Sequence, residues 1–210
     1  MNDFIGALTQ TFGLENLAKI QRTRIGLAGA GGLGSNCAQF LVRSGFCNFT
    51  LVDYDRVEFS NLNRQFFFLH QVGKPKVEAL QENLLQINPD LNITTKQCKI
   101  ESDNVAQLFA DCDVVIEALD CSEYKRLVVE NYLNSQQLLV AVSGLAGWGA
   151  SEDIKIRKIK DRFYLVGDLV SEVSQERPPV APSVVVAAAK QADIVLHYVL
   201  AVKGDEEDGK

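Results

Sequence analysis

A glycine-rich segment, Gly29-Ala30-Gly31-Gly32-Leu33-Gly34, joins a short apolar run to a stretch with helical periodicity. Glycine lets the backbone turn tightly and approach a phosphate, and the helix behind it offers free N–H groups and the positive end of its dipole. Asp53 follows about 20 residues later, where a carboxylate can accept hydrogen bonds from ribose hydroxyls. The glycine pattern alone is a weak signal, but together with this acid it predicts a nucleotide site.

The polar segment after this acid carries several groups that can bind phosphate. It reads Asp53-Tyr54-Asp55, then Ser60-Asn61-Leu62-Asn63-Arg64-Gln65, then Gly73-Lys74-Pro75-Lys76. A hydride-transfer enzyme has no need of an arginine and a lysine just beyond the ribose acid. A triphosphate does, because its charge must be neutralised and its α-phosphorus oriented for attack. The segment therefore favours ATP, and an NAD-dependent oxidoreductase is kept as an alternative.

Asp120 follows a buried-type strand predicted over residues 113–118. Its carboxylate would lie at the carboxyl edge of the sheet, where ligands bind in doubly wound folds. It could hold Mg²⁺ through one carboxylate plus nucleotide phosphates, the usual arrangement for that metal. It could equally cap the helical segment that starts near Ser122. Position alone does not decide between these two roles.

The elements that would position these residues alternate between strand and helix. Strands are predicted over residues 24–29, 49–53, 91–95, 113–118 and 138–142, and helices over residues 33–44, 75–87, 103–109 and 124–134. Residues 154–159 and 162–166 predict a hairpin, and residues 180–202 an Ala-rich helix. We expect an α/β, Rossmann-like, doubly wound and mostly parallel sheet with antiparallel edge strands at the C-terminal side.

The bulk composition narrows the class of protein. The chain has 210 residues, a net charge of −6, and 47% hydrophobic residues. This fits a single domain, predicted over residues 1–203, followed by an acidic tail at 204–210 that we expect to be disordered. The acidic balance argues against nucleic acid as a partner. We see no signal-peptide pattern and no window approaching the ~18 apolar residues that span a bilayer, so we expect a cytoplasmic protein without a membrane partner.

In combination, these motifs resemble the ThiF/MoeB/ubiquitin-activating-enzyme superfamily, and most closely its short ThiF type. The resemblance covers nearly the whole chain and includes the stretch from Gly144 through Gly167-Asp168 to Pro182. It implies an adenylyltransferase, a nucleotidyltransferase that uses ATP and Mg²⁺. Its substrate would be the C-terminal glycine carboxylate of a small ubiquitin-like sulfur carrier protein (ThiS-like), which attacks the α-phosphorus and releases pyrophosphate. In the short ThiF type, this step serves thiamine thiazole biosynthesis.

The resemblance also implies a role for each matching residue. The nucleotide-binding residues would be Gly29, Gly31, Gly32, Gly34, Asp53, Asp55, Ser60, Asn61, Arg64 and Lys76. Among them, Gly32 would approach the phosphates and Asp53 the ribose. Arg64, Lys76 and Asp120 would act on the reacting phosphates, with Asp120 as the Mg²⁺ ligand. Such an enzyme needs no nucleophile of its own, because its contribution is positioning and charge neutralisation.

The chain departs from the family pattern in several places. Cys121 stands where relatives often carry Asn, and Lys125 stands where they often carry Arg. The chain has no C-x-x-C pair, so zinc is not expected. No cysteine lies between Gly167 and Pro182, which implies a separate sulfur donor. The family implies a homodimer whose partner supplies an arginine, a role left unassigned here. The apolar residues within 1–20 could join that interface or pack on the domain's own core.

Other substrates stay open at this point. Within the superfamily, the carrier could be the small subunit of molybdopterin synthase, or the substrate could be a small-molecule or tRNA carboxylate. The acidic charge argues against tRNA, because phosphate contacts need a basic surface. A non-catalytic nucleotide-binding protein is a further alternative. The joint presence of Arg64, Lys76 and Asp120 argues against it.

Overall fold

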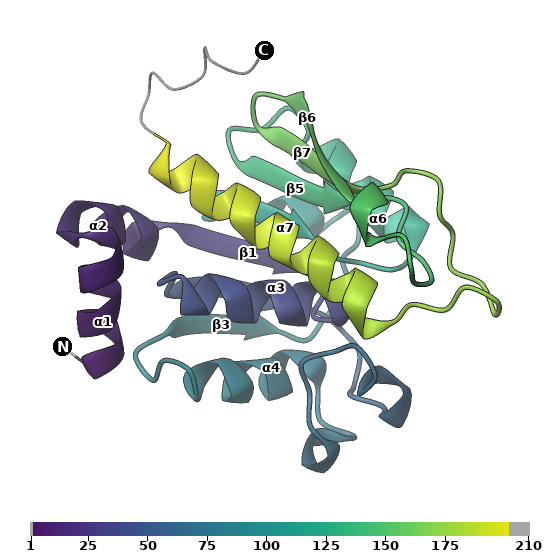
Figure 1. Cartoon of the computed structure of the whole chain (residues 1–210), viewed down its shortest axis with the longest axis horizontal. Coiled ribbons are helices and arrows are strands. Elements are labelled where there is room, and N and C mark those ends of the chain that lie inside the picture. Colours follow the sequence, from purple (N-terminus) through teal and green to yellow (C-terminus); the bar gives the residue numbers. More distant parts are fainter. Residues whose placement is uncertain (1, 202–210) are drawn as a thin grey trace.

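A computed structural model describes residues 2–201 of the chain. These residues form one seven-stranded sheet, in the order β3-β2-β1-β4-β5-β7-β6, with helices on both faces (Figure 1). The predicted domain end at residue 203 and the predicted acidic tail at 204–210 lie outside the described residues.

The strands are β1 (Arg24–Ala28), β2 (Asn48–Val52), β3 (Asn92–Lys96), β4 (Val114–Glu117), β5 (Leu138–Val142), β6 (Lys155–Lys160) and β7 (Phe163–Gly167). The α-helices are α1 (Asp3–Phe12), α2 (Leu14–Arg22), α3 (Gly32–Arg43), α4 (Lys76–Leu85), α5 (Val105–Leu108), α6 (Ser122–Tyr132) and α7 (Ala181–Leu200). Short 3-10 helices are η1 (Phe59–Asn61), η2 (Leu69–Gln71) and η3 (Ser151–Asp153). The predicted alternation of strands and helices is therefore confirmed, with shifts of one or two residues at most boundaries.

The central strand β1 is apolar on both sides because a core lies on each face of the sheet. Ile25 and Leu27 belong to the larger core, which also takes residues from α3, α4 and α7. Ala28 belongs to the second core, under α5 and α6. Gly26 faces that second core too, where an added Cβ would stand 2.6 Å from the ring of Phe109. Burial on both faces explains why this strand reads as a short continuous apolar run.

The C-terminal hairpin differs in one respect from the sequence expectation. β6 and β7 are antiparallel to each other, as predicted. However, β7 also pairs in parallel with β5, so only β6 is an antiparallel edge strand. The exposed edge strand carries Lys155, Lys158 and Lys160, and lysine on an edge discourages pairing with another chain.

The N-terminal residues form two helices that meet at Gly13, whose φ of 77° favours glycine. Asn2 caps the first helix, with its side-chain oxygen accepting a hydrogen bond from the N–H of Ile5 at 2.8 Å. Leu8, Leu17 and Ile20 are buried. These apolar residues therefore pack within the domain's own structure, which was one of the two possibilities left open by the sequence.

Among the described residues, one helix, α7, is long and apolar enough to cross a membrane by length and composition. This corrects the expectation that no window of the chain approaches that level. Ala187, Ala188 and Val195 of α7 are fully buried in the larger core, and the helix crosses the near face of the sheet beside α3 (Figure 1). A helix that covers a sheet needs an apolar, small-residue face, which accounts for this composition.

Candidate nucleotide site

A cavity of about 940 Å³ opens at the carboxyl ends of β1, β2, β4 and β5. The chain runs from β1 outward through β2 to β3, then returns to the other side of β1 to form β4. This reversal is a topological switch point, where ligands bind in open α/β sheets. The cavity is therefore the place where the predicted site residues should meet.

The glycine turn forms one wall of this cavity. Gly29 adopts a φ of 98°, and Gly31 is the N-cap of α3. Gly29, Gly31 and Gly32 line the cavity. Gly34 does not line it. An added Cβ at Gly34 would stand 1.9 Å from the carbonyl oxygen of Gly29, so this glycine allows close packing of the helix on the turn.

Asp53 lies at the end of β2 and is buried. Its Oδ2 accepts a hydrogen bond from the N–H of Ala30 at 2.7 Å, and its Oδ1 accepts one from the N–H of Asp55 at 2.8 Å. Burial raises the pKa of Asp53, and the charge of Lys76 partly opposes that shift. The predicted ribose acid therefore also ties the glycine turn to the segment that follows β2.

Two cations reach the cavity: Arg64 from the connection between β2 and α4, and Lys76 from the first residue of α4. The Nζ of Lys76 is buried and lies 2.7 Å from the Oδ2 of Asp55, whose side chain is half-exposed. The guanidinium of Arg64 donates to the backbone oxygen of Ser60 at 3.1 Å. Arg64, Lys76 and Asp55 all line the cavity. The structure thus brings together both of the predicted phosphate-neutralising side chains.

Ser60 and Asn61 lie outside the cavity lining, although phosphate contacts were expected of them. Asn61 is buried, and its Oδ1 accepts the N–H of Glu58 at 3.0 Å. Ser60 is exposed, and its hydroxyl lies 3.3 Å from a carboxylate oxygen of Glu58. The N–H of Arg64 donates to the backbone oxygen of Asn61 at 3.1 Å. In this structure, the two residues shape η1 and thereby place Arg64.

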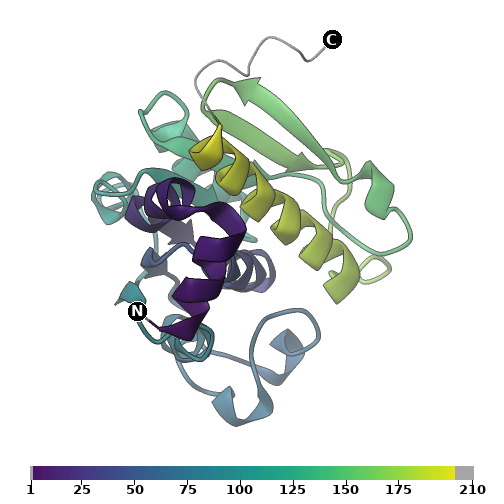
Figure 2. The same ribbon diagram turned by 60° about the vertical axis from the view of Figure 1, so that its left-hand side comes forward.

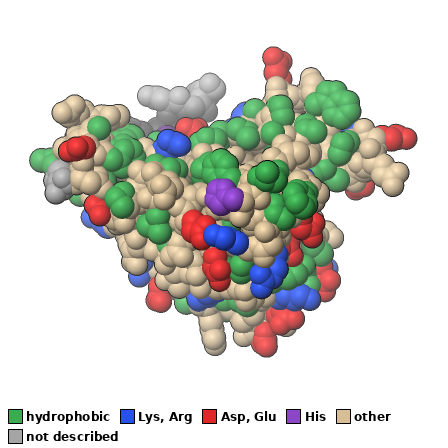
Figure 3. Space-filling view, turned by 90° about the horizontal axis from the view of Figure 1, so that it is seen from below, with side chains coloured by type: hydrophobic (Ala, Val, Ile, Leu, Met, Phe, Trp, Pro, Cys, Tyr) green, Lys and Arg blue, Asp and Glu red, His purple; other side chains and the backbone are tan. Residues whose placement is uncertain are grey.

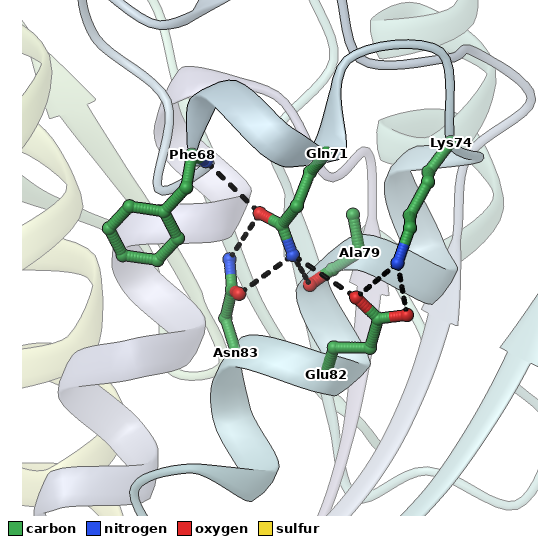
Figure 4. Close-up of polar contacts among 6 residues, drawn as sticks. All are labelled: Phe68, Gln71, Lys74, Ala79, Glu82 and Asn83. Atoms are coloured by element: carbon green, nitrogen blue, oxygen red, sulfur yellow. Dashed lines mark hydrogen bonds and ion pairs between the residues drawn. The ribbon is translucent and has the colours of Figure 1, made fainter.

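A buried glutamine anchors the far end of the same segment, which projects from the body of the molecule in both ribbon views (Figures 1 and 2). The Oε1 of Gln71 accepts the N–H of Phe68 at 3.0 Å, and its Nε2 donates to the Oδ1 of Asn83 at 2.8 Å (Figure 4). Lys74 forms an ion pair with Glu82 at 2.8 Å beside this network. The network fixes the loop on α4, although Phe68 itself remains 49% exposed. Figure 3 shows hydrophobic side chains gathered beside charged ones on the face seen from below.

Asp120 also lines the cavity and lies three residues after the end of β4. It is exposed, and its carboxylate makes no hydrogen bond or ion pair within residues 2–201. The N-cap of α6 is Cys121, without a side-chain cap bond, so Asp120 does not cap that helix. Its oxygens are therefore free to bind a ligand.

Three residues near the site carry features that the sequence did not reveal. Gln65 lines the cavity, and its Oε1 is buried without a hydrogen-bond partner in the described part of the chain. A buried acceptor of this kind is costly unless a ligand donates to it. Glu117 is fully buried and forms an ion pair with Lys125 at 2.8 Å. The only sequence signal for Gln65 was its place directly after Arg64, and Lys125 stood out only as a replacement for arginine.

The arrangement has the charge pattern of a site for a nucleotide triphosphate. Glycine backbone, a helix N-terminus and two cationic side chains line the cavity, together with the Asp120 carboxylate, which has no hydrogen-bond or ion-pair partner among residues 2–201. Backbone N–H groups and cations suit phosphates, whereas a carboxylate that no cation of the described chain pairs with suits a bound divalent cation.

Substitution Lys76→Met should lower stability more at pH 7 than at pH 4. The pKa of Asp53 is raised in the native state above its ordinary value, which it has in the unfolded state. At pH values between these two pKa values, the native state therefore binds more protons than the unfolded state. Stability therefore falls as pH rises through that interval, and removing Lys76 should extend the interval upward. We expect a loss of roughly 1–3 kcal/mol at pH 7 and a smaller one at pH 4, measured by urea unfolding. Lys155→Met, on an exposed edge position, is the control, and an equal loss for Lys76→Met at both pH values would contradict the coupling.

Fold and site together define an α/β protein with a doubly wound sheet and a cavity at its topological switch point. A family model described as the ThiF family matches residues 6–206. The chain belongs to the ThiF family.

Several characterised proteins resemble the chain in sequence. It is 37% identical over 127 residues to the molybdopterin-synthase adenylyltransferase of Escherichia coli, covering 59% of this chain and 48% of that protein. It is 29% identical over 202 residues to the adenylyltransferase and sulfurtransferase UBA4 of Candida glabrata, covering 93% and 47%. It is 33% identical over 166 residues to the SUMO-activating enzyme subunit 2 of Dictyostelium discoideum, covering 78% and 25%. The chain thus spans half or less of the length of these relatives.

The fold has a close counterpart among solved structures. The E. coli tRNA N6-threonylcarbamoyladenosine dehydratase, solved in complex with ATP, matches with a TM-score of 0.83 at 23% sequence identity. The match covers 92% of each chain. At this identity, the match establishes the Rossmann-like fold of the chain.

Proposed function

We propose that this protein is an adenylyltransferase that activates the C-terminal glycine carboxylate of a ubiquitin-like sulfur carrier with ATP. We further propose that residues 1–203 act as one adenylation domain in the cytoplasm, as a homodimer. The observation that carries the proposal is the meeting of Arg64, Lys76 and Asp120 around the glycine turn in one cavity. Neither a hydride-transfer enzyme nor a structural protein requires this set of charges beside a ribose acid.

The donor set at Asp120 fits Mg²⁺. The carboxylate is exposed to the cavity and, within the described residues, unpartnered, and this metal usually takes one or two protein carboxylates plus substrate phosphates. Asp120 would hold the ion. When bound, Mg²⁺ would neutralise charge on the phosphates of ATP.

The chemistry assigned to the chain's own residues is positioning and charge neutralisation. A carboxylate oxygen of the carrier forms a bond to the α-phosphorus as the bond from that phosphorus to the bridging oxygen breaks, and the electron pair leaves with pyrophosphate. Arg64 and Lys76 would stabilise the negative charge that develops on the transferred and departing phosphates. Asp53 would fix the ribose, and Gln65 would accept a hydrogen bond from the nucleotide.

A protein tail as substrate is supported by the outer wall of the cavity. Val170 and Val173 line it and are 81% and 59% exposed, and Trp148, in the loop between β5 and β6, is 66% exposed. Exposed apolar groups beside a pocket mark sites of contact with a partner. A flexible C-terminal tail would cover these side chains as it enters the cavity, which a small carboxylate would not do.

The relatives support the reaction class and leave the carrier open. Relatives bear the names adenylyltransferase, SUMO-activating enzyme and ubiquitin-like modifier-activating enzyme. We propose a ThiS-like carrier of thiamine thiazole synthesis, based on the short ThiF resemblance. The alternative carrier is the molybdopterin synthase small subunit, favoured by the 37% identity to the E. coli enzyme. The absence of cysteine between Gly167 and Pro182 supports a separate sulfur donor.

The test is ATP–pyrophosphate exchange with purified carriers. We expect exchange that requires Mg²⁺ and a ThiS-like carrier ending in Gly-Gly, and that is lost when the terminal glycine is deleted. A molybdopterin-type carrier and tRNA are assayed in parallel, and exchange with the former alone would change the assigned pathway. ATP binding without exchange for any carrier would contradict the proposed reaction.

A further inference from the structure

A buried ion pair lies at the base of the turn that carries Asp120. The side chain of Glu117, the last residue of β4, is 1% exposed. The Nζ of Lys125, on α6, lies 2.9 Å from one of its carboxylate oxygens and 2.8 Å from the other. The same Nζ donates to the backbone oxygen of Leu119 at 2.9 Å. Lys125 lines the cavity but is turned toward the protein backbone.

These contacts use the full hydrogen-bonding capacity of the ammonium group. A lysine has three N–H donors and no acceptor. Two of the contacts of Lys125 are with Glu117 and one is with the oxygen of Leu119. No donor is left for a phosphate. A direct ligand-binding role for Lys125 is therefore disfavoured by its geometry.

The ion pair holds the peptide units on both sides of Leu119. The N–H of Leu119 donates to the Oε1 of Glu117 at 2.8 Å, while the carbonyl oxygen of Leu119 accepts from Lys125. That carbonyl belongs to the peptide bond that leads into Asp120. The position from which the Asp120 side chain departs is thus set by the ion pair, because that side chain makes no hydrogen bond or ion pair of its own within the described residues.

We propose that Glu117 and Lys125 are a positioning pair that fixes Asp120 for the metal-bound nucleotide. This inference rests on the proposed function, in which Asp120 holds Mg²⁺. Groups that orient a metal ligand typically change metal affinity by roughly 10- to 100-fold when they are removed. A buried ion pair by itself is weak evidence for a contribution to stability, so a positioning role accounts better for a charge pair in this place.

The test compares ATP binding by calorimetry in EDTA with ATP binding at increasing MgCl₂. Lys125→Met leaves the Glu117 carboxylate buried and unpaired and can fail to fold, so the informative variant is the double substitution Glu117→Gln with Lys125→Met. We expect the affinity of this double variant for metal-free ATP to stay within about threefold of the parental value. The Mg²⁺ concentration that gives half of the maximal change in ATP affinity should rise roughly 10- to 100-fold. The single substitution Lys125→Arg should keep the parental Mg²⁺ requirement, because a guanidinium can also pair with both carboxylate oxygens.

Arg126→Met is the matched control. Arg126 lies beside Lys125 on α6 and pairs with Glu130, but both side chains are exposed, at 77% and 57%. This variant should keep the parental Mg²⁺ dependence. A parental Mg²⁺ requirement in the double variant would overturn the inference, as would an equal loss of metal-free and metal-bound ATP affinity, which indicates a merely structural pair. Because carrier is absent from this assay, failure of carrier-dependent exchange would count against the proposed function separately.

Discussion

Substitution Asp120→Ala should reduce carrier-dependent pyrophosphate exchange by roughly 100- to 1000-fold, the cost of removing one preorganised electrostatic group from a reaction of this kind. The same substitution should leave the melting temperature within about 2 °C of the parent, because surface substitutions away from packed features change stability by only about 0.5 kcal/mol. Asp120 is exposed and forms no bond within residues 2–201 that its removal could break. A large loss of exchange without loss of stability is the signature of a ligand-binding carboxylate.

Asp111→Ala is the control for that experiment. Asp111 is also exposed, but it precedes β4, whereas Asp120 follows it, so the two carboxylates lie at opposite ends of the same strand. We expect Asp111→Ala to retain parental exchange. Retention of exchange near the parental level in Asp120→Ala would refute the role assigned to this carboxylate.

Substitution Gly34→Ala should destabilise the fold strongly. The added Cβ would stand 1.9 Å from the carbonyl oxygen of Gly29 and 3.3 Å from the Cβ of Ala118. Both neighbours are part of the packing between α3 and the ends of β1 and β4, so relief requires movement of backbone. Overpacking typically costs about 1–3 kcal/mol and can cost more when backbone must shift. We expect a loss of about 3 kcal/mol or more in the free energy of unfolding, measured by urea denaturation, together with loss of ATP binding.

Gly6→Ala is the matched control for this substitution. Gly6 lies inside α1, and an added Cβ there would meet nothing within 4 Å. Alanine is favoured over glycine in a helix interior by up to about 1 kcal/mol, so this variant should be as stable as the parent or more stable. Equal behaviour of the two variants would show that close packing at Gly34 is not what the glycine turn requires.

The sequence predicted the fold well because its strongest signals are local. Continuous apolar runs mark strands buried on both faces, and residues 138–142 coincide fully with β5. The place of β7 could not be predicted, because alternation in residues 154–166 indicates a hairpin but not which strand of the sheet it joins. The two N-terminal helices meet at Gly13, whose positive φ separates them.

The sequence indicated most of the residues that line the cavity, but not how the neighbouring side chains are engaged. Arg64, Lys76, Asp53 and Asp120 do line one cavity, as their positions beside the predicted strand ends suggested. Ser60 and Asn61 do not, because their side chains are engaged in forming η1, a local use of polar groups that sequence spacing cannot distinguish from ligand binding. The pairing of Glu117 with Lys125 was not foreseen, since it depends on how α6 returns to the end of β4.

Ala30 and Asp55 are both held by the carboxylate of Asp53 through hydrogen bonds within the chain itself. The conformational entropy of these two loop positions is therefore lost when the chain folds and need not be lost again on binding. We expect association with ATP to proceed at an ordinary rate for a preformed site, without a slow ordering step, and differences in affinity among site variants to appear mainly in the dissociation rate. In kinetic terms, the buried carboxylate of Asp53 keeps the glycine turn and the segment after β2 in one arrangement for as long as the domain is folded.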